Sequence, residues 1–434
     1  MYLSWFGIIR LGFIQMALGS LVSIAASTFN RVMVVELSLL QIIPGLLLAL
    51  HYFIQISRPN WGFLSDKGGN RTFWIITGVI ILCLGSISAC FGILLIPKNY
   101  LLGLVFSIFA YTLIGIGVGA SGTSLLAFLA TRTDYNKKAA AATITWIMMI
   151  FGAAFTAIFV GKIIDPYTIE KLLKIVTVIS LFWIIISFIT LYKLESTFKP
   201  KINNHLKPVE VTFFQGLKQV LLEPNTRWFT IFVFLSMTAY FMQEPILEPY
   251  AGLIFNFTVG ESTQLTGYHQ SGILLGMIIV GLLVTGVKFG SLRFWVLFGC
   301  VGSGSALILI AILGQISPSK DVLKYSVALL GFFNGNFAVG AIGSMMELAG
   351  YGIKQREGTR MGLWGAGQAI AAGNAMIFST LFVDILQSFT KDVAFSYGII
   401  FTIEGILFLA SAALATRLIR ITAKTNQRYS ENIK

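Results

Sequence analysis

Long apolar runs divide this chain, and the segments between them alternate between strongly and weakly basic. Hydrophobic residues make up 56% of the 434 residues and charged residues only 11%. A helix needs about 20 mainly apolar residues to cross a bilayer. Twelve runs approach that length, at 11–33, 41–58, 73–96, 103–130, 138–161, 172–192, 227–247, 267–287, 292–315, 322–348, 360–384 and 392–416. The sequence therefore predicts an all-α membrane protein with twelve transmembrane helices.

The basic residues predict the orientation of these helices. If the N-terminus is cytoplasmic, 23 of the 31 lysines and arginines fall on the cytoplasmic side and 8 on the other. Cytoplasmic segments of membrane proteins carry such an excess, so both termini are expected in the cytoplasm. The net charge of +13 then reflects topology and contact with anionic lipid headgroups, and it does not indicate nucleic-acid binding. All three cysteines lie inside apolar runs, which predicts neither a disulfide framework nor a metal site.

One polar segment separates the first six apolar runs from the last six. We predict an N-terminal six-helix half at 1–192, a cytoplasmic linker at 193–226, and a C-terminal six-helix half with a basic cytoplasmic tail at 227–434. Within the linker, residues 211–222 have the pattern of a short amphipathic helix on the membrane surface.

A faint internal repeat supports this division. Trp146 precedes Asp165 by 19 residues in the first half, and Trp364 precedes Asp384 by 20 residues in the second. Glycines with the GxxxG spacing that lets helices approach closely also recur before the basic loop of each half, as at Gly331 and Gly335. Repeated halves around a central site are typical of transporters.

The segment Gly62–Arg71, GFLSDKGGNR, lies between two apolar runs. It resembles the loop G-x-L-x-D-[KR]-x-G-[RK]-[RK] of the major facilitator superfamily, which latches one half against the other. Its acidic residue can accept hydrogen bonds from a helix N-terminus and pair with an arginine. The resemblance implies a cytoplasmic latch formed by Gly62, Asp66, Lys67, Gly69, Arg71 and Arg360. The corresponding loop at 286–293 has no acidic residue, so the latch is expected to be one-sided.

Ionisable residues at membrane depth are candidates for function because they are costly there. Arg31 and Glu36 lie toward the outer end of the first run. Residues five apart lie about 140° apart around an ideal α-helix, so we do not expect these two to pair with each other. Each is expected to find another partner, or simply to mark the outer interface.

Two histidines lie within or near apolar runs. His51 is inside the second run, and His269 is near the predicted start of the eighth. A neutral imidazole can ligate a metal, including the magnesium of a chlorin ring. The plainer alternative is a hydrogen bond to a neighbouring helix.

Acidic residues form the remaining group of intramembrane candidates. Glu244 and Glu248 are each followed by proline, and their spacing would place both carboxylates on one helix face. The prolines interrupt the helical hydrogen bonds and free carbonyls, so this segment could hold a proton or a cation; the alternative is a helix end that surfaces into water. Glu347 and Glu404 are isolated acids, and Glu404 is the deeper of the two. No nucleotide-binding fingerprint or paired-cysteine metal site is found, and we predict no enzyme.

Several segments also resemble the PucC/LhaA family. They are 10–19 (RLGFIQMALG), 30–37 (NRVMVVEL), 49–52 (ALHY), 247–250 (LEPY), 340–346 (GAIGSMM) and 356–366 (REGTRMGLWGA). These segments span both halves and are more specific than the superfamily loop. Members of this family have also been described as chlorophyll synthase subunits, but this sequence has no aspartate-rich prenyl-diphosphate motif.

This resemblance implies an assembly factor in the inner or thylakoid membrane of a phototrophic bacterium. Such a protein binds chlorophyll or bacteriochlorophyll as cargo, or delivers it to light-harvesting or photosystem apoproteins. His51 is then the candidate axial ligand and His269 a weaker one, with enzymes of chlorophyll biosynthesis as further candidate partners. Two alternatives are a proton-coupled secondary transporter of a small amphiphile, using Glu36, Glu244 or Glu404, and a transport-inactive scaffold for nascent antenna subunits.

Overall fold

The computed structural model describes residues 2–58, 60–61, 70–134, 137–195, 224–316, 319–350 and 357–431. Within these ranges the chain is helical and has no β-strand, which confirms the prediction of an all-α protein. Several predicted features lie outside the described residues or side chains, namely the helix at 211–222, Gly62, Asp66, Lys67, Gly69, Glu347 and Arg360.

The helices fall into two groups on either side of the predicted linker. The N-half contains α1 (Trp5–Ile24), η1 (Ala25–Phe29), η2 (Val32–Glu36), α2 (Ile42–Ile54), η3 (Gln55–Ser57), α4 (Arg71–Leu95), α5 (Tyr100–Arg132), α6 (Lys138–Ile163) and α7 (Ile169–Leu191). The C-half contains α9 (Pro224–Met242), α10 (Leu247–Phe255), α11 (Val259–Leu282), η5 (Leu283–Val287), α12 (Leu292–Ile316), α13 (Lys320–Gly350), α14 (Glu357–Thr390) and α15 (Val393–Glu431).

The apolar runs predict these helices well. Eleven helices of the described residues are long and apolar enough to cross a membrane, and a shorter apolar helix spans Ile42–Ser57. The protein is therefore an integral membrane protein. The run at 41–58 corresponds to the shorter helix, so the count of twelve complete spans stays a prediction.

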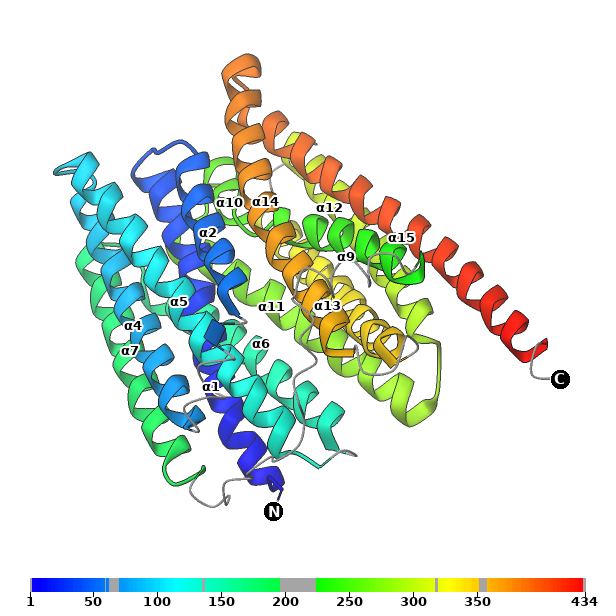
Figure 1. The fold of residues 1–434 in the computed structure, drawn as a ribbon. Coiled ribbons are helices and arrows are strands. Elements are labelled where there is room, and N and C mark those ends of the chain that lie inside the picture. Colours follow the sequence, from blue (N-terminus) through cyan, green and yellow to red (C-terminus); the bar gives the residue numbers. More distant parts are fainter. Residues whose placement is uncertain are drawn as a thin grey trace.

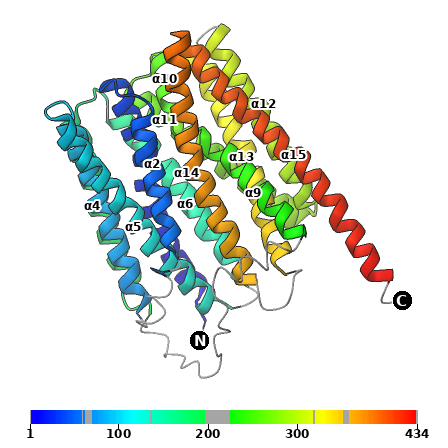
Figure 2. The same cartoon turned by 45° about the horizontal axis from the view of Figure 1, so that its top comes forward.

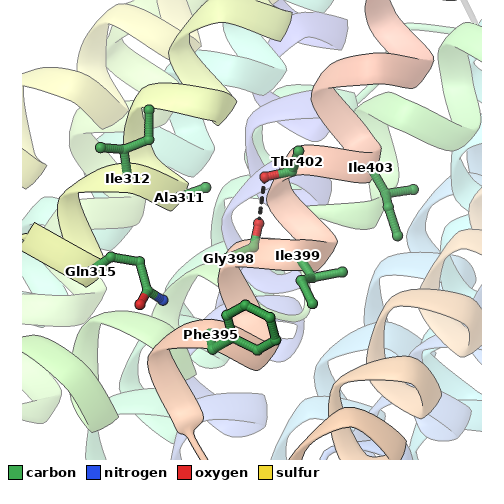
Figure 3. Close-up of a pocket in the computed structure, with 8 residues that line it drawn as sticks. All are labelled: Ala311, Ile312, Gln315, Phe395, Gly398, Ile399, Thr402 and Ile403. Atoms are coloured by element: carbon green, nitrogen blue, oxygen red, sulfur yellow. Dashed lines mark hydrogen bonds between the residues drawn. The ribbon is translucent and has the colours of Figure 1, made fainter. Parts of the chain in front are cut away.

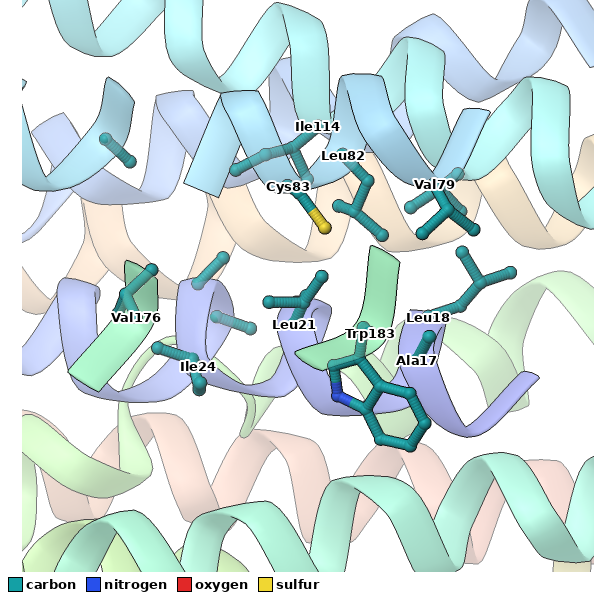
Figure 4. Packing of buried hydrophobic residues seen from close by; sticks show 14 of the residues in the cluster. Ala17, Leu18, Leu21, Ile24, Val79, Leu82, Cys83, Ile114, Val176 and Trp183 are labelled. Atoms are coloured by element: carbon teal, nitrogen blue, oxygen red, sulfur yellow. The ribbon is translucent and has the colours of Figure 1, made fainter. Parts of the chain in front are cut away.

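The two groups of helices form two bundles that lie side by side (Figures 1 and 2). In the N-half α1 packs on α6, and α4 packs on α5 and α7. In the C-half α12 packs on α13 and α15, and α11 packs on α13. Each half has its own apolar core; Figure 4 shows part of the N-half core, where residues such as Leu21, Leu82 and Trp183 meet.

Glycines bring neighbouring helices into close contact, since helices in lipid associate mainly through packing. A Cβ added at Gly78 would lie 2.5 Å from the backbone nitrogen of Ser121, and one added at Gly117 would lie 2.5 Å from that of Leu82. The α4–α5 pair therefore depends on two reciprocal glycines. Gly331 and Gly335 similarly allow α13 to approach the backbone of α11.

The halves meet along a seam formed by α6 against α11 and α2 against α14. We use the term distal end for the end of the bundle away from Trp5, where the chain reverses between η2 and α2, between α6 and α7, between α10 and α11, and between α14 and α15. The starts of α1 and α9 and the end of α15 all lie at the opposite end (Figure 1). The polar residues described below lie along the seam and at its distal end.

Candidate functional site at the seam between the halves

The first helix of each half is irregular. In the N-half, α1 continues into the π-helical segments η1 and η2. In the C-half, a turn at 243–246 separates α9 from α10. Interrupted helices at corresponding positions of two repeats are the usual location of a transporter's binding site. This correspondence makes the region where they meet our candidate functional site.

Proline explains the contact between these two interruptions. Pro249 has no N–H, so it cannot donate to the carbonyl of Pro245 one turn earlier. That carbonyl instead accepts hydrogen bonds from Asn30 Nδ2 at 2.5 Å and from Gln41 Nε2 at 2.7 Å. A carbonyl of the C-half thus becomes the partner of two N-half side chains, as the prediction of freed carbonyls requires.

The predicted arrangement of the two glutamates is wrong. Because the helix is interrupted, Glu244 lies in the turn while Glu248 lies in α10. Glu244 accepts a hydrogen bond from Tyr52 Oη of the N-half at 2.9 Å. Glu248 accepts one from Thr266 Oγ1 of α11 at 2.5 Å. The two carboxylates bind different helices, so they do not form one two-carboxylate site.

The prediction that Arg31 and Glu36 do not pair is also wrong. They form a salt bridge, with guanidinium Nη1 donating to Glu36 Oε1. The segment between them is a π-helix, whose i→i+5 hydrogen bonds bring residues five apart onto one face. The expected second partner of Arg31 is also present, since its Nη2 donates to the carbonyl of Phe257 at 2.9 Å. The side chain of Arg31 is 3% exposed and that of Glu36 is 38% exposed.

This ion pair lines a cavity of about 650 Å³ at the distal end. The cavity also includes Asp165 and Tyr167 of the N-half and the α10–α11 connection. It therefore lies between the halves, at the place where the sequence predicted an outer interface.

His51 is buried on α2, and its hydrogen bonds define its tautomer. Gln55 Oε1 accepts a hydrogen bond from Arg58, so the Gln55 amide nitrogen faces His51 Nε2, at 3.0 Å. Nε2 is then the acceptor, and Nδ1 carries the proton of the neutral ring. Nδ1 has no hydrogen-bond partner within the part of the chain that the structure describes. His51 thus holds an unused N–H donor, while its lone pair is engaged by Gln55.

His269 lies in the middle of a helix and not near its start, which corrects the prediction. Helix α11 begins at Val259 because Thr258 and Glu261 form a capping box there. The predicted run began at 267 because the first turns of α11 contain polar residues. These turns can be polar since they pack on α6 of the other half. His269 Nε2 lies 3.2 Å from Asn334 Nδ2 and 3.4 Å from Gln243 Nε2. It is part of a buried hydrogen-bond network within the C-half.

The other predicted residues lie apart from this site. Glu404 is fully buried on α15, and neither carboxylate oxygen has a hydrogen bond of normal geometry among the described residues. Arg71 begins α4 and donates to the Ala127 carbonyl of α5 at 2.6 Å and to Thr131. Its backbone nitrogen donates to Glu195 at 3.0 Å. These contacts of Arg71 lie within the N-half, and the predicted cytoplasmic latch stays a prediction.

Sequence reasoning missed Asn30 and Gln41, which link the halves through Pro245. It noted Asp165 and Asp384 only as markers of the repeat, although each bonds the other half. No group of three or more histidine, cysteine, aspartate or glutamate side chains among the described residues is placed to hold a metal ion.

An apolar groove lies between α12 and α15, away from the seam (Figure 3). Its volume is about 320 Å³, and it is lined by Ala311, Ile312, Gln315, Phe395, Gly398, Ile399, Thr402 and Ile403. The Thr402 hydroxyl donates to the Gly398 carbonyl at 2.8 Å, so it is used within its own helix. Gln315 supplies the one side-chain amide of this lining.

Comparison with known proteins identifies relatives along nearly the whole chain. The sequence profile of the family described as PUCC protein matches residues 28–423. The chain is 49% identical over 419 residues to the bacteriochlorophyll synthase 44.5 kDa chain of Rhodobacter capsulatus, covering 96% of each protein. It is 28% identical over 428 residues to protein PucC of Cereibacter sphaeroides, covering 93% of this chain and 90% of that one.

Solved transporters share the fold. A bacterial homologue of the human lysosomal transporter Spinster matches with a TM-score of 0.71 and 13% identity, covering 96% of this chain and 97% of that one. The peptide transporter POT matches with a TM-score of 0.70 and 14% identity, covering 95% of both chains. At this identity the likeness establishes the fold alone.

Proposed function

Since this chain belongs to the PucC family, we propose that it is a membrane assembly factor that binds bacteriochlorophyll and delivers it to light-harvesting apoproteins. The relative that is 49% identical over 96% of both chains supports this role, because its name links it to bacteriochlorophyll. The pigment is cargo in this proposal, and no covalent step is assigned to the protein.

The physical properties of the pigment agree with the fold. Bacteriochlorophyll has a flat, largely apolar ring and a long apolar tail, so it partitions into lipid and needs no aqueous route. A two-bundle membrane protein can offer such a molecule an apolar surface together with a few buried polar groups. The groove between α12 and α15 provides an apolar surface, and its volume of about 320 Å³ can accept part of such a molecule but not the whole of it.

His51 is the residue to which we assign pigment recognition. As the ring stands, its Nε2 lone pair is used by Gln55, so axial ligation of magnesium requires Gln55 to move away. The N–H at Nδ1 has no acceptor among the described residues. Donation from it to a carbonyl group of the pigment keeps the Gln55 bond, but it requires the packing that buries His51 to open. Replacing Gln55 distinguishes the two modes, because it removes the group that occupies Nε2 while the imidazole itself stays on α2.

The test is the pigment content of the full-length protein purified in mild detergent from a phototrophic host, measured by absorption and chromatography. We expect bound bacteriochlorophyll in the wild type and a lower pigment-to-protein ratio in His51→Ala. His269→Ala is the matched control, because it removes another buried imidazole from the opposite half. Gln55→Leu should raise pigment binding if His51 is an axial ligand and leave it unchanged if His51 donates through Nδ1.

Three results would contradict the proposal. Equal pigment content in His51→Ala and the wild type would exclude the assigned role of His51. Pigment-free wild type that still co-purifies with light-harvesting apoproteins would exclude delivery and favour a scaffold. Wild type that carries neither pigment nor apoproteins would exclude the assembly function itself.

A further inference from the structure

Asp165 and Asp384, the two aspartates of the internal repeat, both lie at the distal end of the seam. Asp165 follows α6, and Asp384 lies in the last turns of α14. These helices occupy corresponding positions in the two halves, as the spacing from Trp146 and Trp364 indicates. Each aspartate points at the N-terminus of a helix in the other half.

The first of these contacts joins α6 to α11. Asp165 Oδ1 accepts a hydrogen bond from the backbone N–H of Gly260 at 3.0 Å, and Oδ2 accepts one from Thr258 Oγ1 at 2.5 Å. A Cβ added at Gly260 would overlap both this carboxylate and the carbonyl oxygen of Gly161. The contact therefore requires glycine at the start of α11.

The second contact joins α14 to α2. Asp384 Oδ1 accepts from the backbone N–H of Gln41 at 2.9 Å, and Oδ2 accepts from that of Ile42 at 2.8 Å. A Cβ added at Gly45 would overlap the side chain of Thr380. The two contacts share this geometry. In each, a carboxylate binds the start of a helix, and a glycine of that helix packs on the residue four positions before the aspartate, which is Thr380 here and Gly161 in the first contact.

The two contacts are thus the same interaction, an aspartate of one half bound to a helix N-terminus of the other half. The N-half provides an aspartate to the C-half, and the C-half provides one to the N-half. A carboxylate at a helix N-terminus neutralises unpaired N–H groups and the positive end of the helix dipole. Both helix ends are left without these acceptors when the halves separate, although water at the distal surface can replace them.

We propose that Asp165 and Asp384 form a reciprocal pair of latches that hold the distal end of the seam closed, and that both must release for that end to open. This inference follows from the repeat and the fold, and it holds whatever the cargo is. Each latch is one carboxylate on one helix end, which is an interaction weak enough to release during a conformational cycle. Neighbouring hydrogen bonds such as the one from Asn30 to Pro245 remain when the aspartates are removed. Removing the aspartates should therefore lower the population of the closed state without abolishing it.

The experiment measures access to the seam in the full-length protein. Thr263 of α11 is fully buried, and its hydroxyl lies 3.2 Å from that of Thr28 across the seam. Thr263→Cys, in a background whose native cysteines are replaced by alanine, reports opening through its reaction with a membrane-impermeant maleimide in nanodiscs. Losing one helix cap shifts such an equilibrium about fivefold, so we expect the labelling rate to rise about fivefold for Asp165→Ala or Asp384→Ala and about 25-fold for both.

Asp392→Ala is the matched control. Asp392 caps α15 of its own half by accepting from the Phe395 N–H at 3.0 Å, so its loss should leave the labelling rate within twofold of the parent. If the double alanine variant does not elute as a single folded species, Asp165→Asn with Asp384→Asn replaces it, with a smaller increase expected. A folded double variant that labels at the parental rate would overturn the proposal, as would an increase of the same size in Asp392→Ala.

Discussion

The ion pair between Arg31 and Glu36 allows a quantitative prediction because its two members differ in burial. Arg31 is 3% exposed and Glu36 is 38% exposed. Removing one partner of a buried pair costs about 3–5 kcal/mol when the charge that remains is buried. The cost is much smaller when the remaining charge can be hydrated. The effect of each substitution therefore depends on which partner it leaves behind.

Glu36→Ala leaves a buried guanidinium whose remaining hydrogen bond among the described residues is the one to the Phe257 carbonyl, and Nε has no partner there even in the wild type. We expect this variant to lose about 3–5 kcal/mol of stability. Arg31→Met keeps much of the volume and leaves Glu36 partly exposed to water. Its main cost is the buried Phe257 carbonyl that loses a donor, about 1–3 kcal/mol.

The double variant provides the sharper result. Once Arg31 is replaced by methionine, Glu36 has no buried charge to neutralise, so adding Glu36→Ala should cost almost nothing. Arg31→Met with Glu36→Ala should therefore match Arg31→Met alone and be more stable than Glu36→Ala alone. The coupling between the two sites should then equal the cost of Glu36→Ala alone, about 3–5 kcal/mol.

Thermal unfolding in mild detergent can be followed with a fluorogenic maleimide, because Cys83, Cys90 and Cys300 are all buried in the folded protein. We expect the unfolding midpoint of Glu36→Ala to be lower than those of Arg31→Met and of the double variant. A double variant less stable than Glu36→Ala, or an Arg31→Met variant less stable than Glu36→Ala, would refute the reasoning from burial.

Two further substitutions can be tested with the same unfolding assay. Gly272→Ala places a Cβ onto the carbonyl of Ala328 between α11 and α13 and should cost about 1–3 kcal/mol. Gly281→Ala is on the same helix with nothing within 4 Å of the added Cβ, so it should be neutral or stabilising by up to about 1 kcal/mol. Equal unfolding midpoints for the two variants would contradict this. Tyr52→Phe removes the hydrogen bond to Glu244 and keeps the ring, so it should cost about 1.5–3 kcal/mol, and an unchanged midpoint would show that this bond contributes nothing to stability.

Most of the fold could be predicted because a membrane span must be both long and apolar. The exceptions have physical causes. Helix α11 begins at Val259, although most of residues 259–266 are not apolar, because these turns pack on α6. The π-helical winding of η2 was not predictable from a pattern that assumes 3.6 residues per turn, and it reversed the conclusion about Arg31 and Glu36.

The sequence singled out some residues that the structure places along the seam, such as Arg31 and Glu244, but it did not give their connections. The repeat singled out Asp165 and Asp384 without a role, since their partners lie about 95 and 343 residues away in the sequence. Gln41 belongs to no recognised motif. Its role in linking the halves follows from its hydrogen bond to the freed carbonyl of Pro245. Side chains that bond across the seam depend on how the halves dock, which local sequence does not encode.

Helix α2 connects the features that these proposals treat separately. At its start, Gln41 and Ile42 donate to Asp384. Near its end it carries His51, about 15 Å from that start at 1.5 Å per residue. A helix of this length moves as one body, so a displacement of His51 by a bound pigment would also act on the latch at Asp384. Coupling between two sites requires an element with two arrangements that both sites bias, and α2 is the described element that contacts both.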